Sequence, residues 1–567
     1  MQRVARIRAI GLIVGLILMI VALGGVLISY FLSLDVPEVE VAPARAIPNT
    51  DVNPYGANFF LEREVELYKR EETVKMAAEA GIGWAKQQFI WAQIEPQDVD
   101  FQDPAIWERR WGKYDDIVDL CGRYGLQIVA RLDHPPPWTR EDNSIPDAPP
   151  DDLADYADFV YGFVKHYQGR VRYVQIWNEP NIYPEWGNRQ VDPAGYVEML
   201  KIAYQAAKSA DPNVYVLSAP LAPTLEDFSV RRNLSELIFL EEMYQAGAAD
   251  YFDILSANAF GFDLPPEDPP SVDKLNFQRV RLQREIMERH GDGHKAIWFN
   301  EYGWNASPDS FPEEKLVWKR VTEEQQADYL LRGIALARHE WPWAGVFNIW
   351  FFRQVGDLSP NQSAYYFRMV DVDFTPRQVY YAVKDAAAGL HVAGAGHFEE
   401  THPSVQDTLD WRTVIDPTAS GGAYLACQRA GAGLSFTFSG DSVDLVTRRG
   451  PNSGRLIVTL DGRRVPGLPQ DNKERSYLDL YHPEMERIRF RLADNAGAGQ
   501  QHTLRLKVSD EASVASSSSL CVIDAFEVQA APPSTFPVLP VLLLGVGMTL
   551  VSFSLYREIT RNGWRRR

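Results

Sequence analysis

The sequence has few cysteines and no excess of positive charge. Only three cysteines occur in 567 residues, and no Cys-x-x-Cys or histidine-rich spacing predicts a metal site. The formal net charge is -19 at pH 7, which argues against nucleic acid as a partner because phosphate binding needs a basic surface. A Gly-rich phosphate turn after the first expected strand is also missing, which argues against an open doubly wound sheet. No cofactor is expected.

The three cysteines fall into two groups. Cys121 lies at helical spacing with Ile117 and Leu120, which predicts a buried thiol. Cys427 and Cys521 lie near the start and the end of a second domain. Outside the cytoplasm these two could pair, but two free buried thiols are the alternative, and spacing alone leaves both open.

Apolar and aromatic residues, by contrast, are abundant. Hydrophobic residues make up 46% of the chain, with 15 Trp and 25 Tyr, so the chain can bury a large core. Most of these rings are expected in that core, and some are expected to line a cleft that binds the flat, apolar faces of sugars.

Two long apolar runs, residues 9–34 and 536–556, each have the length of a membrane-spanning helix, which takes about 20 residues. Arginines precede the first run and follow the second. The positive-inside rule therefore predicts cytoplasmic ends, residues 1–8 and 557–567, with everything between them on the outside. The alternative for the first run is a cleavable signal peptide. Because its apolar part is long and Ala42-Pro43-Ala44 is a poor cleavage site, we favour an uncleaved anchor; either outcome exports the middle of the chain.

The chain between the two runs divides into two patterns. Residues 35–50 are rich in Pro, Ala and Val and are expected to be a linker. Over residues 51–392, short apolar runs alternate with helical patterns, which predicts a (β/α)8 TIM barrel. Pro-rich stretches at 144–152 and 263–270 are expected to be loops that wall its cleft. The expected strands are 57–61, 84–89, 126–132, 171–181, 214–220, 252–260, 296–301 and 345–352.

Helical periodicity stops near residue 397, and short alternating segments such as GLSFTFSG and HTLRLKV follow, separated by Gly, Asn and Asp turns. This pattern predicts an antiparallel β-sandwich of the jelly-roll kind over residues 397–530. Together with Trp411, the GGAYL turn, GPNSGRLIVTLDG and the closing IDAFEV, it resembles galactose-binding-like modules. The resemblance implies carbohydrate binding; a spacer or packing domain is the alternative.

Two glutamates lie at the ends of expected barrel strands: Glu179 in QIWNEPN and Glu301 in IWFNEYGW. The carboxyl ends of barrel strands form the active face, and the fourth and seventh strands lie across the mouth from each other. Two carboxyl groups across a cleft suit glycoside hydrolysis, in which one protonates the leaving oxygen and the other attacks the anomeric carbon or activates water. For Glu179, the alternative is a cap on the following helix, helped by Pro180.

These motifs resemble those of the clan A glycoside hydrolases, the cellulase-like and β-xylosidase-like (β/α)8 enzymes. The resemblance rests on WNEPN and WFNEYGW, with GIGWAKQQFIWAQIEP at the second strand and GLQIVARLDHPPPW at the third, and covers about residues 50–390. It implies a retaining mechanism with Glu179 as general acid/base and Glu301 as nucleophile, their carboxyl groups about 5 to 5.5 Å apart.

The resemblance also implies contacts with the sugar. Asn178 would bond the 2-hydroxyl, His134 would contact other hydroxyls, and Trp350 would form an aromatic platform under the reacting ring. For His134 and Trp350, a loop-bound or core role is the alternative. Trp91 either stacks on sugars or packs loops, and Tyr302 either lies at the site or packs beside it.

Two positions depart from the family's pattern. Lys86 stands where an arginine often supports the nucleophile, and lysine supplies a point charge in place of a planar fork. Phe260 stands where a hydroxyl or imidazole often touches the nucleophile. Glu301 is therefore expected to rely on Lys86 and on Asn258 or Asn300.

We therefore predict a membrane-anchored, extracytoplasmic retaining glycosidase that acts on an oligosaccharide or polysaccharide. One alternative is a surface glycan-binding protein that kept the barrel without catalysis, supported by the two departures. The other is an anchored scaffold in which the sandwich is the working part.

Overall fold

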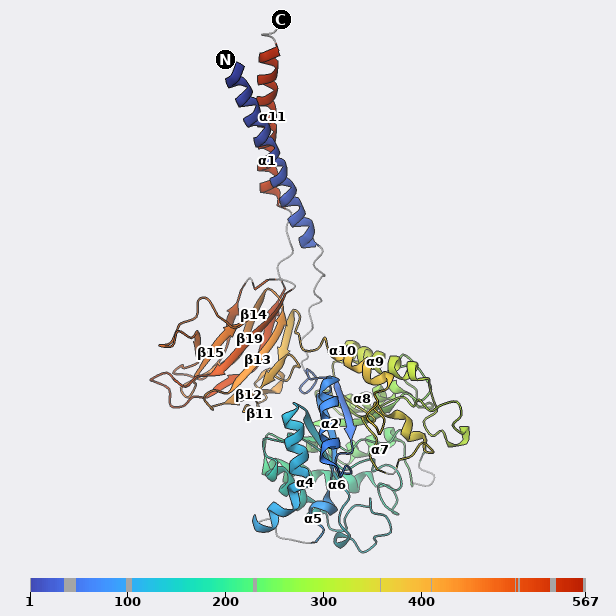
Figure 1. The fold of residues 1–567 in the computed structure, drawn as a ribbon. Coiled ribbons are helices and arrows are strands. Elements are labelled where there is room, and N and C mark those ends of the chain that lie inside the picture. Colours follow the sequence, from blue (N-terminus) through green and yellow to red (C-terminus); the bar gives the residue numbers. More distant parts are fainter. Residues whose placement is uncertain are drawn as a thin grey trace.

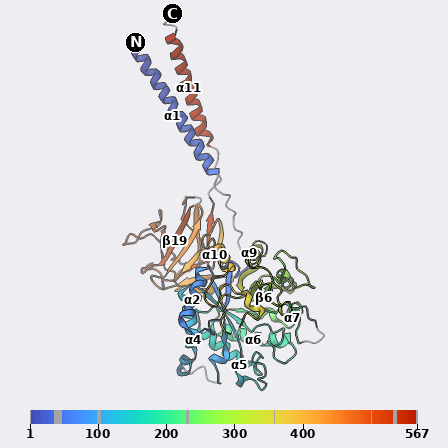
Figure 2. The same ribbon diagram turned by 45° about the vertical axis from the view of Figure 1, so that its right-hand side comes forward.

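The computed structural model describes residues 2–34, 47–97, 104–227, 232–356, 358–408, 410–494, 496–497, 500–530 and 537–563. A barrel and a β-sandwich lie beside each other, and two long helices stand apart from both (Figures 1 and 2). Residues 35–46 of the predicted linker at 35–50, which include Ala42-Pro43-Ala44, and the terminal arginines 565–567 lie outside the described residues.

The first domain is a closed barrel of eight parallel strands in chain order, which confirms the predicted TIM barrel. Each strand is followed by an outer helix, because the strands are buried on both faces and need that cover. The strands are β1 (Tyr55–Phe59), β2 (Trp84–Ile90), β3 (Gln127–Asp133), β4 (Tyr173–Ile176), β5 (Tyr215–Leu217), β6 (Ile254–Phe260), β7 (Ala296–Gly303) and β8 (Ala344–Ile349). The outer helices are α2 (Leu67–Glu79), α4 (Pro104–Arg123), α5 (Leu153–His166), α6 (Pro193–Ala210), α7 (Glu236–Gln245), α8 (Val280–Arg289), α9 (Glu323–Glu340) and α10 (Gln378–Ala387).

Large aromatic rings close the amino-terminal end of the barrel. Trp84 and Trp298 pack with ring centroids 4.8 Å apart, and Tyr173 lies 4.8 Å from Trp298 and 5.1 Å from Tyr215. All four rings are buried. The barrel is thus plugged at its base, and polar groups inside it can face solvent only at the opposite end.

The second domain is built from antiparallel strands, which confirms the predicted sandwich. In β13 (Gly433–Ser439) and β19 (Gln501–Val508), alternate residues are buried, so one face of the sheet packs on the core. The other strands are β9 (Gly396–Glu399), β10 (Val405–Asp407), β11 (Arg412–Ile415), β12 (Ala423–Cys427), β14 (Ser442–Arg449), β15 (Arg455–Leu460), β16 (Arg463–Arg464), β17 (Tyr477–Asp479), β18 (Glu486–Ala493), β20 (Cys521–Ile523) and β21 (Ala525–Gln529).

Polar contacts join the sandwich to the base of the barrel. Arg172, just before β4, donates from Nη1 to Thr413 Oγ1 at 2.6 Å and from Nη2 to the Trp411 carbonyl at 3.1 Å. Asp51, just before β1, accepts from the backbone amide of Glu399 at 2.8 Å. The sandwich therefore covers the end of the barrel opposite to the carboxyl ends of the strands.

The two remaining helices, α1 (Gln2–Leu34) and α11 (Val538–Gly563), lie side by side in both views (Figures 1 and 2). Each contains a 23-residue segment, Ile7–Ser29 or Val538–Thr560, that is long and apolar enough to cross a membrane. Neither segment is buried against the domains. The assignment of these segments as candidate membrane spans rests on their length and composition.

Candidate active site

Glu179 stands on a strained turn directly after β4. Trp177 has φ 71° and Glu179 has φ 42°, a left-handed backbone that costs about 1 to 3 kcal/mol at a residue with a side chain. Two bonds hold the turn: the Glu179 amide donates to the Pro220 carbonyl at 3.0 Å, and Trp177 Nε1 donates to the Glu185 carbonyl at 3.0 Å. Such strain persists where the surrounding structure enforces it, and here it fixes Glu179 at the mouth of the barrel.

Glu179 does not cap the following helix. That helix, α6, begins at Pro193, and its amino terminus is capped by Asp192, whose side chain accepts from the Gly195 amide at 3.0 Å. The capping alternative for Glu179 is therefore wrong.

Glu301 lies on β7 and is buried, with 7% of its surface exposed. Its cationic neighbour is Lys86 on β2, whose Nζ lies 3.7 Å from Glu301 Oε1. At this length the contact is an ion pair and not a hydrogen bond. Among the described residues, Lys86 Nζ has no hydrogen-bond partner, and Glu301 is the carboxylate with which it forms an ion pair.

Asn258 on β6 links the two glutamates. Its Cα is the register partner of Glu301 in the β6–β7 pair, and its Nδ2 donates to Glu179 Oε1 at 2.6 Å. Its Oδ1 accepts from Asn300 Nδ2 at 3.0 Å, which fixes the orientation of the amide. Asn258 was expected to support Glu301; in the structure its hydrogen bond goes to Glu179.

The two carboxyl groups have different electrostatic surroundings. Burial, followed by the charges of Glu301 and Glu185, raises the pKa of Glu179 to about 8. Burial also raises the pKa of Glu301, but the cations of Lys86 and Arg131 oppose that shift. At neutral pH, Glu179 therefore holds its proton, and Glu301 is the carboxyl group that the neighbouring cations favour as an anion.

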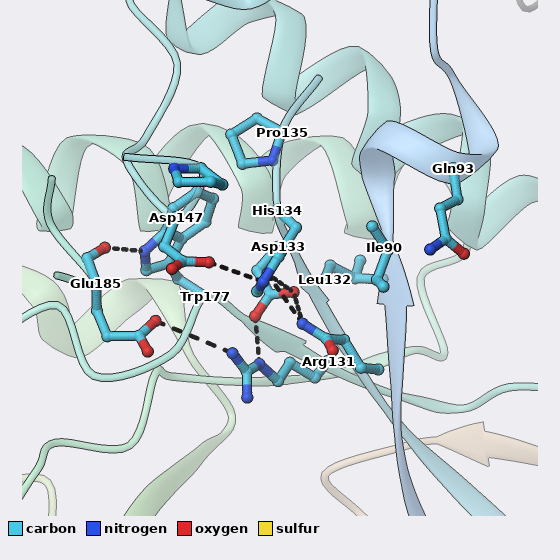
Figure 3. A network of polar contacts seen from close by, with 12 residues as sticks. Ile90, Gln93, Arg131, Leu132, Asp133, His134, Pro135, Asp147, Trp177 and Glu185 are labelled. Carbon is cyan, nitrogen blue, oxygen red and sulfur yellow. Dashed lines mark hydrogen bonds and ion pairs between the residues drawn. The ribbon is translucent and has the colours of Figure 1, made fainter. Parts of the chain in front are cut away.

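A charged network borders the pair at the end of β3 (Figure 3). Arg131 pairs with Asp133, and its Nη2 lies 4.0 Å from Glu185 Oε2. Burial would raise the pKa of Asp133, but Arg131 and His134 hold it well below its usual range. Burial raises the pKa of Glu185 to about 7, against the opposing charge of Arg131. Arg131 thus shares its charge among several carboxyl groups around the mouth.

His134 is held on both sides of its ring. Nδ1 lies 3.0 Å from Asp133 Oδ1, and Nε2 lies 2.7 Å from Asp147 Oδ1. Burial would lower the pKa of His134, but the carboxylates of Asp133 and Asp147 outweigh it and raise the pKa to about 10. The imidazolium therefore ties the Pro-rich loop at 144–152 to β3, and neither ring nitrogen is left for a sugar hydroxyl (Figure 3).

Two of the predicted sugar-binding residues lie at the mouth. Asn178 is 3% exposed, and its Oδ1 has no hydrogen-bond partner among the described residues, which leaves an acceptor beside Glu179. Trp350, directly after β8, is partly exposed and meets Phe60 edge to face, with ring centroids 5.8 Å apart.

Trp91 and Tyr302 lie in the core instead. Trp91 is fully buried, stacks on Phe159 with ring centroids 5.1 Å apart, and donates from Nε1 to Glu95 Oε2 at 2.7 Å. Tyr302 is also fully buried and donates from its hydroxyl to the Leu330 carbonyl on α9 at 2.6 Å. Both rings pack the barrel against its helices, which favours the packing alternative for each over contact with substrate.

Arg131, Asp133, Asp147 and Glu185 were missed by the sequence reasoning. Arg131 and Asp133 carried a usable signal, because charged residues at the carboxyl end of a buried strand are the same signal that identified Glu179. Asp147 and Glu185 lie on loops and carried none. Within the described residues, no group of three or more His, Cys, Asp or Glu side chains is arranged to hold a metal ion.

A scan against protein-family models and a search of curated proteins give no match. Among solved structures, the chain is similar to a family 39 glycoside hydrolase from Bacteroides cellulosilyticus (18% identity, 82% of each chain covered, TM-score 0.45). It is also similar to a GH39 β-xylosidase from Caulobacter crescentus (15% identity, 83% of this chain and 98% of that chain, TM-score 0.45). A third is a glucosidase from Croceicoccus marinus (13% identity, 82% and 99%, TM-score 0.45).

Proposed function

We propose that the barrel is a retaining O-glycosidase in which Glu179 is the general acid/base and Glu301 the nucleophile. The observation that carries the proposal is the asymmetry of the pair. Both carboxyl groups lie at the barrel mouth, linked through Asn258. Among the described residues, Glu301 forms an ion pair, with Lys86 at 3.7 Å, and Glu179 forms none. A retaining glycosidase needs this division, with one carboxylic acid and one carboxylate.

In the proposed first step, the Glu301 carboxylate attacks the anomeric carbon, and the bond from that carbon to the leaving oxygen breaks. Glu179 donates its proton to the leaving oxygen, and a glycosyl ester forms on Glu301. In the second step, Glu179, now a carboxylate, takes a proton from water, which attacks the anomeric carbon and frees Glu301. Asn178, with its open acceptor, is proposed to bond the sugar 2-hydroxyl, and Trp350 to support the ring.

We further propose that α1 and α11 both cross a membrane and that the barrel and the sandwich lie outside the cytoplasm. Two observations support this topology. Neither apolar segment is buried against the barrel or the sandwich in the described structure, although a soluble protein would bury such surface. Arginines precede the first segment and follow the second, at the two chain termini. The positive-inside rule expects such basic residues on the cytoplasmic side.

The stereochemistry of the first product tests the mechanism. Aryl glycosides and polysaccharides are screened for a substrate, and the product is followed by proton NMR within the first minutes, before the free sugar mutarotates. We expect the product to appear first with the anomeric configuration of the substrate. Initial appearance of the opposite anomer would mean that water attacks directly, which contradicts the nucleophilic role of Glu301. Binding without any turnover across the panel would favour the non-catalytic alternative.

A further inference from the structure

Cys427 and Cys521 lie directly opposite each other in the sandwich. Cys427 is the last residue of β12 and Cys521 is the first residue of β20, and the two are register partners in the antiparallel β12–β20 pair. Residues that are directly opposite in such a pair have Cα atoms about 4.5 to 5.5 Å apart, and their side chains point to the same face of the sheet. This Cα spacing lies within that of disulfide-bonded cysteines, about 4.4 to 6.8 Å.

The face that the two cysteines share is the core face. Side chains alternate along a strand, so Leu425 points the same way as Cys427, and Ile523 points the same way as Cys521. All four belong to one hydrophobic core cluster, and each is at most 4% exposed. The two thiols are therefore directed into the same enclosed space, and no other cysteine lies in this domain.

The surroundings tolerate the loss of both thiol hydrogens. Cys521 Sγ donates a weak hydrogen bond to the Arg455 carbonyl at 3.6 Å, but that carbonyl also accepts from the Ser509 amide at 2.9 Å. Cys427 Sγ acts as an acceptor, from the Arg429 amide at 3.3 Å, and a disulfide sulfur retains that capacity. Oxidation would thus leave no buried polar group without a partner here.

We propose that Cys427 and Cys521 form a structural disulfide that joins β12 to β20. The oxidant is a protein or small-molecule disulfide of an oxidising compartment. One cysteine thiolate attacks the oxidant's disulfide, which forms a mixed disulfide and releases one thiol. The second cysteine thiolate then attacks the protein sulfur of that mixed disulfide. The oxidant is reduced to two thiols, which take up the two protons lost by the cysteines.

The order of events follows from burial. Cys427 is 4% exposed and Cys521 is fully buried in the folded sandwich, and burial raises the pKa of both thiols, which makes them poor nucleophiles once the core has closed. The bond therefore forms while the domain folds after export. Because the two cysteines are about 90 residues apart in the chain, the bond closes most of the sandwich into one loop and restricts its unfolded state.

Differential alkylation of the full chain tests the proposal. The chain is extracted from membranes under acid quench, unfolded in guanidinium and treated with N-ethylmaleimide. It is then reduced and treated with a deuterated maleimide. We expect the light label on Cys121 alone and the heavy label on Cys427 and Cys521, with a linked 427–521 peptide before reduction. Light label on all three cysteines overturns the proposal.

Thermal unfolding tests the structural role of the bond. Reduction is expected to lower the melting temperature of the sandwich by roughly 10 °C. The Cys427→Ala/Cys521→Ala double variant should melt with the reduced protein and not respond to reductant, whereas Cys121→Ala should respond as the parent does. An unchanged melting temperature on reduction overturns the structural role.

The pairing rests on the proposed extracytoplasmic location of the sandwich, but it is independent of the proposed glycosidase activity. If Glu301→Gln abolishes hydrolysis while three free thiols are found, only the disulfide is overturned. If no glycoside is hydrolysed but the linked peptide is present, only the proposed function is overturned.

Discussion

Buried carboxyl groups gather at both ends of the barrel, and the two groups differ in how they are paired. The mouth cluster comprises Glu179, Glu185 and Glu301. The base cluster, at the junction with the sandwich, comprises Asp51, Glu399, Glu400 and Asp524, all less than 8% exposed. Both clusters contain carboxyl groups with raised pKa values, so a perturbed pKa alone does not distinguish a catalytic site from a structural junction.

Hydrogen bonds within the protein hold part of the base cluster. Two of its oxygens, Glu399 Oε2 and Asp524 Oδ2, are buried without a hydrogen-bond partner among the described residues, and Asp524 Oδ2 forms an ion pair with Arg487 Nε at 2.9 Å. Asp51 accepts from the Glu399 amide at 2.8 Å, and Glu399 Oε1 accepts from Ser420 Oγ at 2.9 Å. Asp524 accepts from the Ser420 amide at 2.8 Å. Burial, followed by the charge of Glu399, raises the pKa of Glu400 well above its usual value. The Asp51–Glu399 bond joins the barrel to the sandwich, and the two Ser420 bonds lie within the sandwich.

The mouth cluster has buried polar neighbours that lack hydrogen-bond partners. Lys86 Nζ and Asn178 Oδ1 are buried without hydrogen-bond partners in the part of the chain that the structure describes. Leaving such groups unpaired is costly, about 1 to 3 kcal/mol each, and is tolerated where a ligand or reacting group satisfies them. Both clusters therefore contain such atoms, and what distinguishes the mouth cluster is its place at the carboxyl ends of the barrel strands, where the active sites of TIM barrels form.

Replacing the same side chain in each cluster should give the largest contrast. Glu301→Gln removes the proposed nucleophile and is expected to lower kcat by a factor on the order of 10⁴ to 10⁶, as for other nucleophiles that act within a unit. Glu400→Gln, the matched control at the base, should retain the parent's kcat and KM. Steady-state kinetics on one preparation measures both, and a similar loss in the two variants would refute the distinction between the clusters.

Within the mouth cluster, Glu179→Ala should have the next largest effect. Loss of a general acid typically lowers the rate by about 10²- to 10⁴-fold. The loss of first-step rate should be smallest for substrates whose leaving group is a weak base, such as a nitrophenolate, because these need little protonation. Pre-steady-state rates for a series of aryl glycosides measure the dependence. An equal loss for every leaving group would argue that Glu179 is not the proton donor.

Lys86 should control the pH range of the reaction. The Lys86 cation favours the Glu301 anion, so Lys86→Gln should raise the pKa of Glu301 and move the acid limb of the kcat/KM profile to higher pH. At pH 6 we expect a loss of roughly 10- to 100-fold. Lys86→Arg should return the acid limb to the pH at which the parent has it. If the acid limb of Lys86→Gln stays at the parent's pH, Lys86 does not lower the pKa of Glu301.

The basic limb of the same profile should come from Glu179. Its pKa of about 8 means that the proton needed for the first step is lost above that pH, so the activity of the parent should fall above about pH 8. The pKa of Lys86, which burial lowers to about 8, should add to the same decline. A profile of kcat/KM between pH 4 and 10 measures both limbs, and full activity at pH 10 would contradict the assignment.

The smallest effect is expected on stability at the base cluster. Because the pKa of Glu400 is raised by folding, its contribution to stability is present below the unfolded pKa and is lost as pH rises toward the folded pKa. Glu400→Gln removes this dependence and should raise the free energy of unfolding at pH 7 by roughly 1 kcal/mol or more, with little change at pH 4. Thermal unfolding of the parent and of Glu400→Gln at pH 4 and pH 7 measures this difference in stability. Glu301→Gln serves as the comparison variant from the mouth cluster.

The sequence was sufficient to locate the strands and the proposed catalytic pair, and the reasons are physical. Buried strands appear as apolar runs, and the carboxyl ends of barrel strands meet at one face, so a glutamate at the end of such a run lies at the mouth. Tyr302 could also have been placed, because side chains alternate along β7 and the neighbour of an inward Glu301 must point outward toward the helices. Asp147 and Glu185 could not, since they reach the network from loops, which carry no periodicity.

The most direct measurement is covalent trapping on the intact protein. A 2-fluoro glycoside with a good leaving group, matched to whichever sugar the screen identifies, slows hydrolysis of the glycosyl ester so that the intermediate accumulates. Digestion and mass spectrometry then locate the label. We expect one fluoroglycosyl group per chain, on Glu301, and none in Glu301→Gln. A folded protein that hydrolyses the parent sugar but carries the label on another residue, or none at all, would contradict this expectation.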